Sequence, residues 1–118
     1  MIKFYVNQII ESLAYVFSKG CSHNDLKLEN ILLDQNFDIK LADFGCVSHL
    51  KKNACGKTNF GSNFVGSEYY VSPELYSGGY PDEKNDLFAL GVCIFILYFG
   101  TVPFNKANVT DPNYRYFF

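Results

Sequence analysis

The stretch that decides the fold is His23-Asn24-Asp25-Leu26-Lys27-Leu28-Glu29-Asn30, which is followed by Asp43-Phe44-Gly45. The first stretch holds a carboxylate, an ammonium and an amide within a few residues, and the second adds another carboxylate beside a glycine. Transfer of a phosphoryl group to a hydroxyl needs this set of side chains. One carboxylate receives the hydroxyl proton, the lysine neutralises the transferring group, and the amide and the other carboxylate bind Mg²⁺ on the nucleotide phosphates.

These two stretches resemble two motifs of eukaryotic protein kinases, the catalytic loop H-R-D-L-K-x-x-N and the D-F-G. Two later stretches resemble kinase motifs in the same order. Ser72-Pro73-Glu74 is similar to A-P-E, and Asp86-Leu87-Phe88-Ala89-Leu90-Gly91 is similar to the start of the long central helix of the kinase C-lobe. Each string alone has an ordinary structural explanation, so the resemblance rests on the order and spacing of all of them.

One position of the catalytic loop departs from the family pattern. Asn24 stands where the family usually has Arg. In the family this Arg pairs with a phosphate on the activation loop and orders the loop. Asparagine carries no charge and cannot make such a charge-assisted pair.

The resemblance implies a role for each polar residue of the two stretches. Asp25 and Lys27 would be catalytic: Asp25 would orient the acceptor hydroxyl and take its proton, and Lys27 would stabilise the transferring group. Asn30 and Asp43 would bind Mg²⁺. The residues expected to bind ATP are Lys27, Asn30, Leu32 and Asp43, with Leu32 under the adenine ring. The residues expected to be structural are His23, Phe44 and Asp86, with Asp86 anchoring the catalytic-loop backbone to the central helix.

Hydrophobic periodicity predicts the elements that carry these motifs. They are a helix over residues 2–17 ended by Gly20, strands over 31–33 and 37–41 joined by a turn at 34–36, a central helix from about 86 to 99, and a further helix beginning near 114. The apolar stripe of the first helix is Ile2, Val6, Ile9, Ile10, Leu13, Ala14 and Phe17. The hairpin would bring Asn30 and Asp43 to the same place, and Asp82 or Asn85 would cap the central helix.

The expected fold class is therefore α+β: a mainly helical fragment of a protein-kinase-like C-lobe, with a small β-hairpin between the catalytic loop (23–30) and the D-F-G (43–45). Residues 1–118 would form one partial kinase domain, with an activation segment over 45–74. No glycine-rich loop or strand lysine precedes the catalytic loop. We therefore expect the N-lobe and the C-terminal helices to be absent, the chain alone to be inactive, and a partner to cover the exposed C-lobe core.

The function that the resemblance implies is ATP-dependent phosphoryl transfer to serine or threonine hydroxyls of a protein substrate. Two alternatives stay open: a non-catalytic kinase-like binding module, and a small-molecule phosphotransferase of the aminoglycoside or choline kinase type, in which Asn also occurs at the second position of the loop. Lys27, Gly45 and the Pro73-Glu74 segment argue against the small-molecule enzyme. The intact set of Asp25, Lys27, Asn30 and Asp43 argues against the non-catalytic binding module, which has no chemical need for all four.

Charge and cysteine content limit the classes of partner and the cellular location that the sequence predicts. The net charge of −2 gives no electrostatic reason to expect nucleic acid or an anionic membrane. The N-terminal apolar run is interrupted by Asn7, Gln8 and Glu11 and is no signal peptide. The cysteines lie far apart and form no C-x-x-C, so we expect reduced thiols and a cytoplasmic location.

Overall fold

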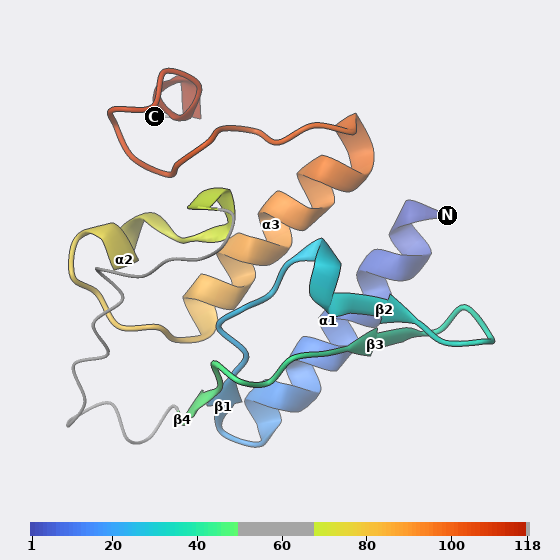
Figure 1. The fold of residues 1–118 in the computed structure, drawn as a ribbon. Coiled ribbons are helices and arrows are strands. Elements are labelled where there is room, and N and C mark those ends of the chain that lie inside the picture. Colours follow the sequence, from blue (N-terminus) through green and yellow to red (C-terminus); the bar gives the residue numbers. More distant parts are fainter. Residues whose placement is uncertain (50–67, 118) are drawn as a thin grey trace.

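The computed structural model describes residues 1–49 and 68–117, and its elements form an α+β fold (Figure 1). In chain order these elements are α1 (Ile2–Ser18), β1 (Cys21–Ser22), β2 (Ile31–Leu33), β3 (Ile39–Leu41), β4 (Ser48–His49), α2 (Pro73–Tyr76) and α3 (Glu83–Phe99). Short 3₁₀ turns lie at Leu28–Asn30, Glu68–Tyr70 and Tyr114–Phe117. The predicted activation segment runs through residues 50–67, which lie outside the described residues.

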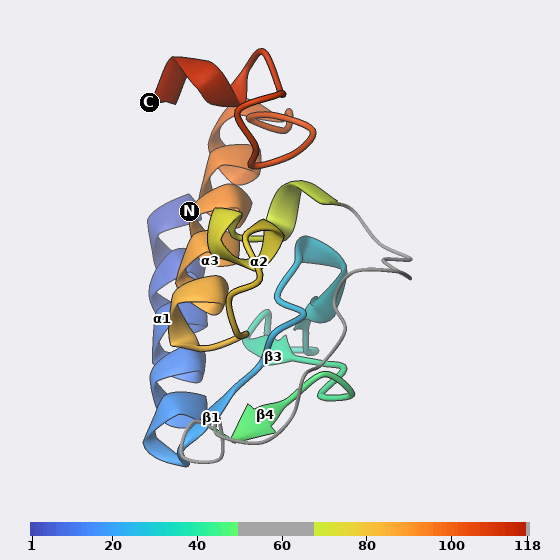
Figure 2. The same ribbon diagram turned by 90° about the vertical axis from the view of Figure 1, so that its left-hand side faces the viewer.

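Helices α1 and α3 pack against each other, and Figure 2 shows them lying side by side. The buried residues of α1 are Ile9, Leu13 and Val16. The predicted stripe was therefore too wide, because Ile10 and Ala14 face solvent. Gly20, with φ of 71°, follows the end of the helix as the sequence predicted.

The β2–β3 hairpin pairs Ile31 with Leu41 and Leu33 with Ile39. The second strand is shorter than predicted, since it begins at Ile39 and Phe37 lies in the turn with φ of 64°. The reason is Asp34, whose Oδ1 accepts hydrogen bonds from the backbone N–H groups of residues 36 and 38 at 2.8 and 3.0 Å. The turn therefore extends to residue 38.

Helix α3 is the scaffold of the fold. It begins at Glu83, earlier than predicted, because the Asp82 side chain caps it by accepting a hydrogen bond from Lys84 N at 2.8 Å. It ends at Gly100, which has a left-handed φ of 70°. The buried hydrophobic core gathers around it and includes Ile9, Leu13, Leu26, Tyr70, Ala89, Leu90, Val92, Cys93 and Phe104.

A second, smaller sheet was not predicted. Strands β1 and β4 pair antiparallel, with Cys21 opposite His49 and Ser22 opposite Ser48. Each strand is only two residues long, which is too short to carry a readable period in the sequence. This sheet joins the start of the catalytic loop to the segment that follows Gly45. In the described part of the chain, no helix is both long and apolar enough to span a lipid bilayer.

Candidate active site

Asp25, Lys27 and Asn30 form one hydrogen-bonded cluster. Lys27 Nζ lies 3.0 and 2.8 Å from the two carboxylate oxygens of Asp25. Asn30 Nδ2 donates to Asp25 Oδ2 at 3.0 Å and to the Asp25 carbonyl oxygen at 2.8 Å. Because both bonds use Nδ2, the amide oxygen of Asn30 is the atom that can bind a cation.

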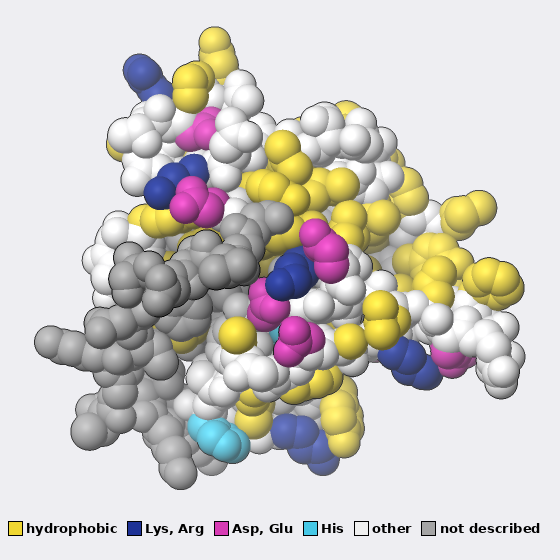
Figure 3. Space-filling model, viewed as in Figure 1, with side chains coloured by type: hydrophobic (Ala, Val, Ile, Leu, Met, Phe, Trp, Pro, Cys, Tyr) yellow, Lys and Arg dark blue, Asp and Glu magenta, His cyan; other side chains and the backbone are white. Residues whose placement is uncertain are grey.

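Lys27 is held in its charged form. Its hydrogen bond to Asp25 raises the pKa of the ammonium above its usual range, against a smaller opposing effect of burial. The carboxylates of Glu29 and Asp43 raise the pKa further. The side chains of Lys27 and Asp25 are 24% and 30% exposed, so the pair is open to a ligand from solvent. In the view of Figure 3, acidic and basic side chains lie together near the middle of the face that is shown.

The backbone of the catalytic loop is fixed by Asp86 from α3. Its Oδ2 accepts a hydrogen bond from His23 N at 2.6 Å, and its Oδ1 accepts one from Asn24 N at 2.7 Å. Burial raises the pKa of the Asp86 carboxyl, and the two backbone N–H groups oppose that shift. The predicted structural role of Asp86 is confirmed.

The β2–β3 hairpin brings the residue before Asp43 into contact with the catalytic loop. Ala42 N donates to Asn30 O at 2.9 Å, and the His23 ring Nε2 lies 3.0 Å from Ala42 O. Asp43, directly after Ala42, adopts a left-handed φ of 60°. A Cβ on Gly45 would lie only 3.2 Å from Asp43 Oδ1, so the glycine gives this carboxylate its space. Asn30 precedes β2 and Asp43 follows β3, so both residues lie at the open end of the hairpin.

Leu32 and Phe44, which the sequence also predicted to belong to the site, lie outside the hydrogen-bonded cluster around Asp25. Leu32 lies on β2 and is 51% exposed, so its side chain is an accessible apolar surface. Phe44 is 49% exposed, and its ring packs on His23 with the centroids 4.8 Å apart.

Three positioning residues were missed by the sequence analysis. Asn85 Oδ1 accepts a hydrogen bond from Ser72 N at 3.3 Å, and Tyr70 Oη accepts one from Leu28 N at 3.3 Å. These contacts tie residues 68–76 to α3 and to the catalytic loop. Gln8 fixes the hairpin, since its Oε1 accepts a hydrogen bond from Ile39 N at 2.7 Å. The sequence offered no signal specific to Gln8, because Asn7, Glu11 and Ser12 are also polar residues of this helix.

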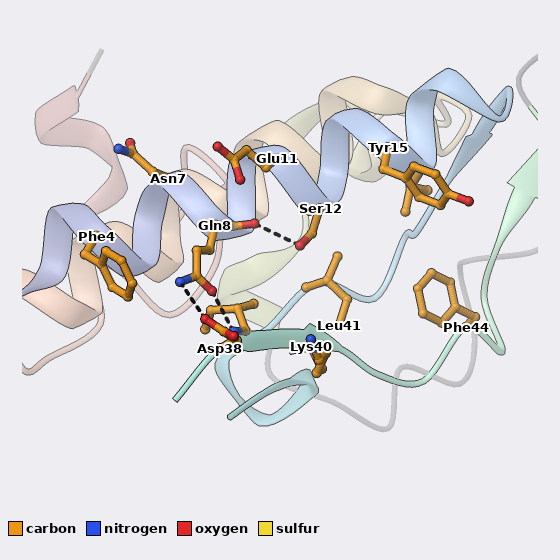
Figure 4. A pocket seen from close by; sticks show the side chains of 12 residues that line it. Phe4, Asn7, Gln8, Glu11, Ser12, Tyr15, Asp38, Lys40, Leu41 and Phe44 are labelled. Carbon is orange, nitrogen blue, oxygen red and sulfur yellow. Dashed lines mark hydrogen bonds between the residues drawn. The ribbon is translucent and has the colours of Figure 1, made fainter. Parts of the chain in front are cut away.

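Gln8 also lies in a cleft of about 830 Å³ between α1 and β3 (Figure 4). Other lining residues include Phe4, Glu11, Tyr15 and Phe44. None of the three side chains of the Asp25 cluster lines this cleft, so it is a separate feature from the site of the predicted chemistry.

The donor atoms fit Mg²⁺ that is shared with a phosphate ligand. Mg²⁺ prefers oxygen ligands and is commonly bound by one or two carboxylates together with substrate phosphates. Asn30 and Asp43 offer an amide oxygen and a carboxylate of this kind. Among residues 1–49 and 68–117, no three histidine, cysteine or acidic side chains gather into a metal site that is complete without a ligand.

Comparisons with known proteins agree with this geometry. The family model of the protein kinase domain matches residues 1–116. Serine/threonine-protein kinase ppk21 of Schizosaccharomyces pombe is 38% identical over 110 residues, which cover 91% of this chain and 20% of that protein. The human NUAK family SNF1-like kinase 1 is 42% identical over 104 residues, or 87% of this chain and 15% of that protein.

Human 3-phosphoinositide-dependent protein kinase 1 is 40% identical over 106 residues, which cover 90% of this chain and 19% of that protein. The chain thus spans a fifth or less of the length of these relatives. With the family model matched over nearly the whole sequence, and the catalytic-loop cluster anchored to the central helix, the chain belongs to the protein kinase family.

Proposed function

We propose that this chain supplies the acceptor and metal side of a site that transfers a phosphoryl group from ATP to a serine or threonine hydroxyl of a protein. The observation that carries the proposal is the cluster of Asp25, Lys27 and Asn30, in which a carboxylate, an ammonium and an amide are linked by hydrogen bonds. The serine/threonine kinase names of the relatives support the acceptor class. Lys27 supports it too, since protein serine/threonine kinases carry lysine at this position.

In this proposal Asp25 receives the proton of the acceptor hydroxyl. The carboxylate is oriented from both sides, by the Lys27 ammonium and by the Asn30 amide. An arriving hydroxyl competes with Lys27 for one of the carboxylate oxygens. Lys27, which stays charged, then lies beside the group being transferred and offsets its negative charge.

Asn30 and Asp43 would hold Mg²⁺ through their oxygens, and Leu32 would contact the adenine ring. The metal supplies charge neutralisation on the phosphate oxygens when it is bound. The fixed position of the Asn30 amide, bonded to the Asp25 carbonyl at 2.8 Å, keeps its oxygen in place before a ligand arrives. Such preorganisation is most of what a protein contributes to phosphoryl transfer.

The test is Asp25→Asn in this chain joined to a kinase N-lobe, because the chain alone is expected to be inactive. The protein is assayed for phosphoryl transfer to a general protein substrate and for binding of Mg·ATP. Transfer should fall by about a hundredfold or more, because a proton acceptor is lost. Nucleotide affinity should stay within about twofold, since Asp25 acts on the acceptor.

The matched control is Glu83→Gln, which removes an exposed carboxylate in the first turn of α3 and should leave both measurements unchanged. Full transfer activity in the Asp25→Asn variant would refute the assignment. Mg·ATP binding without any transfer by the wild-type chain joined to the same N-lobe would favour the non-catalytic binding module.

A further inference from the structure

A second pair of chemically reactive side chains lies in the small β1–β4 sheet. Cys21 and His49 are opposite each other in the pairing, and Cys21 Sγ lies 3.5 Å from His49 Nδ1. The other acceptor near the thiol, the carbonyl oxygen of Lys19, is more distant at 3.7 Å. A thiol beside an imidazole is the arrangement that makes a cysteine nucleophilic, because the ring takes the thiol proton.

The pair can be reached from solvent. His49 is exposed, and Cys21 is partly exposed. The sheet is only two residues long on each strand. A small reagent can therefore approach Cys21 without unfolding the catalytic loop.

The other described cysteines lack these conditions. Cys93 is fully buried, and burial raises the pKa of its thiol to about 12. Cys46 is exposed, but partial burial of its sulfur and the charges of Asp25 and Asp43 raise the pKa of its thiol. Cys46 therefore serves as an internal comparison, because it is an exposed thiol without an activating imidazole contact in the described residues.

We propose that Cys21 is a modification site, at which its thiolate exchanges with a low-molecular-weight disulfide to form a mixed disulfide. The thiol proton passes to His49 Nδ1, and the Cys21 sulfur attacks one sulfur of the reagent. A new S–S bond forms as the reagent's own S–S bond breaks. The Cys21 sulfur is thereby oxidised to the disulfide level, and the departing half of the reagent leaves as a reduced thiolate that takes up the proton.

This inference does not rest on the proposed phosphoryl transfer, and its test needs no kinase assay. The full chain is incubated with oxidised glutathione, and the mixed disulfide at each cysteine is followed over time by peptide mass spectrometry. Cys21 should react at least about tenfold faster than Cys46, since Cys21 has a base within hydrogen-bond distance while burial and nearby carboxylates raise the pKa of the Cys46 thiol.

His49→Asn should slow the reaction at Cys21 by about tenfold. An ordinary thiol is only a few per cent ionised at neutral pH, so loss of an activating base can cost at most about thirtyfold. His49→Gln, a second variant without imidazole, should have the same effect.

Two controls separate activation from damage to the sheet. Ser48→Ala removes the contacts of the Ser48 hydroxyl with the Ser22 hydroxyl at 2.9 Å and with Asn24 Nδ2 at 2.8 Å but keeps the imidazole, and the rate at Cys21 should stay within about twofold. Cys46→Ser should likewise leave that rate unchanged. Equal rates at Cys21 and Cys46, an unchanged rate in both His49 variants, or an equal loss in Ser48→Ala would overturn the proposal.

Discussion

At the scale of single residues, Ser72 stands where the A-P-E motif has alanine, and its extra hydroxyl is unfavourable for stability. Ser72 is fully buried, and its Oγ has no hydrogen-bond partner in the described structure. It precedes α2 as the N-cap residue but makes no side-chain capping bond. The hydroxyl is therefore removed from water without replacement of its hydrogen bonds, which is unfavourable.

We predict that Ser72→Ala raises the free energy of unfolding by about 1 kcal/mol, because it removes a buried hydroxyl that lacks a partner. Asn85→Ala should lower the free energy of unfolding, since it leaves the Ser72 backbone N–H without its acceptor. Urea unfolding of both variants measures the two effects. A loss of stability in Ser72→Ala would show that the hydroxyl has a partner, such as a bound water.

Asn24 is the second residue with an unusual role. It has φ of 63°, and its Nδ2 donates to Cys46 O at 3.1 Å and to Ser48 Oγ at 2.8 Å. The side chain thus bonds directly to the segment after Gly45. An uncharged amide in this position offers no partner for a phosphate charge.

Activity should therefore be nearly independent of phosphorylation at Thr58, Ser62 or Ser67, which lie outside the described residues. The measurement is the transfer rate of the chain joined to a kinase N-lobe, before and after phosphatase treatment. A fall of about tenfold, equivalent to roughly 1.4 kcal/mol in the barrier, would contradict this prediction.

At the scale of elements, one carboxylate organises the loop that follows α3. Asp111 accepts hydrogen bonds from the backbone N–H groups of Asn105, Lys106, Asn113 and Tyr114 at 2.9 to 3.2 Å. Burial opposes ionisation of this carboxyl, but the backbone N–H groups together outweigh it and lower the pKa of Asp111 below its ordinary value. The loop positions Phe104 and Tyr114, whose rings pack edge to face with centroids 5.1 Å apart.

The lowered pKa predicts how stability depends on pH. A carboxyl whose pKa is lower in the folded state stabilises the fold above its ordinary pKa, and this stabilisation is lost as pH falls toward the folded value. Wild type should melt at a higher temperature than Asp111→Asn at pH 7, and the difference should shrink below about pH 4.

Thermal unfolding of both proteins over this pH range is the measurement. The control is Asp82→Asn, since the Asp82 side chain accepts one backbone hydrogen bond from the described residues, the capping bond at the start of α3. A difference between wild type and Asp111→Asn that grows on acidification would contradict the expected sign.

At the scale of the whole molecule, many large hydrophobic side chains are exposed to solvent. Exposed hydrophobic residues include Phe4 and Ile10 on α1 and Leu87, Leu97, Tyr98 and Phe99 on α3. Figure 3 shows hydrophobic side chains spread over a broad area of one face. Apolar patches beyond a few hundred Å² are rare on soluble monomers, so we expect this surface to associate.

Residues 1–118 expressed alone should therefore form oligomers or aggregates. The double variant Tyr98→Lys with Phe99→Lys should shift the chain toward monomer, as measured by sedimentation velocity. Tyr116→Lys is the matched control, because Tyr116 is 90% exposed but lies outside α3. A wild-type chain that sediments as a monomer would refute this prediction.

The sequence by itself determined the family and the order of the larger elements, and it predicted the residues of the candidate site. Four motifs in a fixed order predicted the catalytic loop, the hairpin and the central helix, because helical and turn signals are local. Asp25, Lys27 and Asn30 are close in sequence, so their meeting followed from the loop that holds them.

Only the tertiary structure decided the contacts that fix this site in place. Asp86 lies 63 and 62 residues along the chain from the His23 and Asn24 amides that it holds, and Gln8 lies 31 residues from Ile39. The β1–β4 sheet joins two segments that carry no strand pattern of their own. Such contacts depend on how α3 and α1 pack, and packing arises from the whole chain rather than from any local stretch.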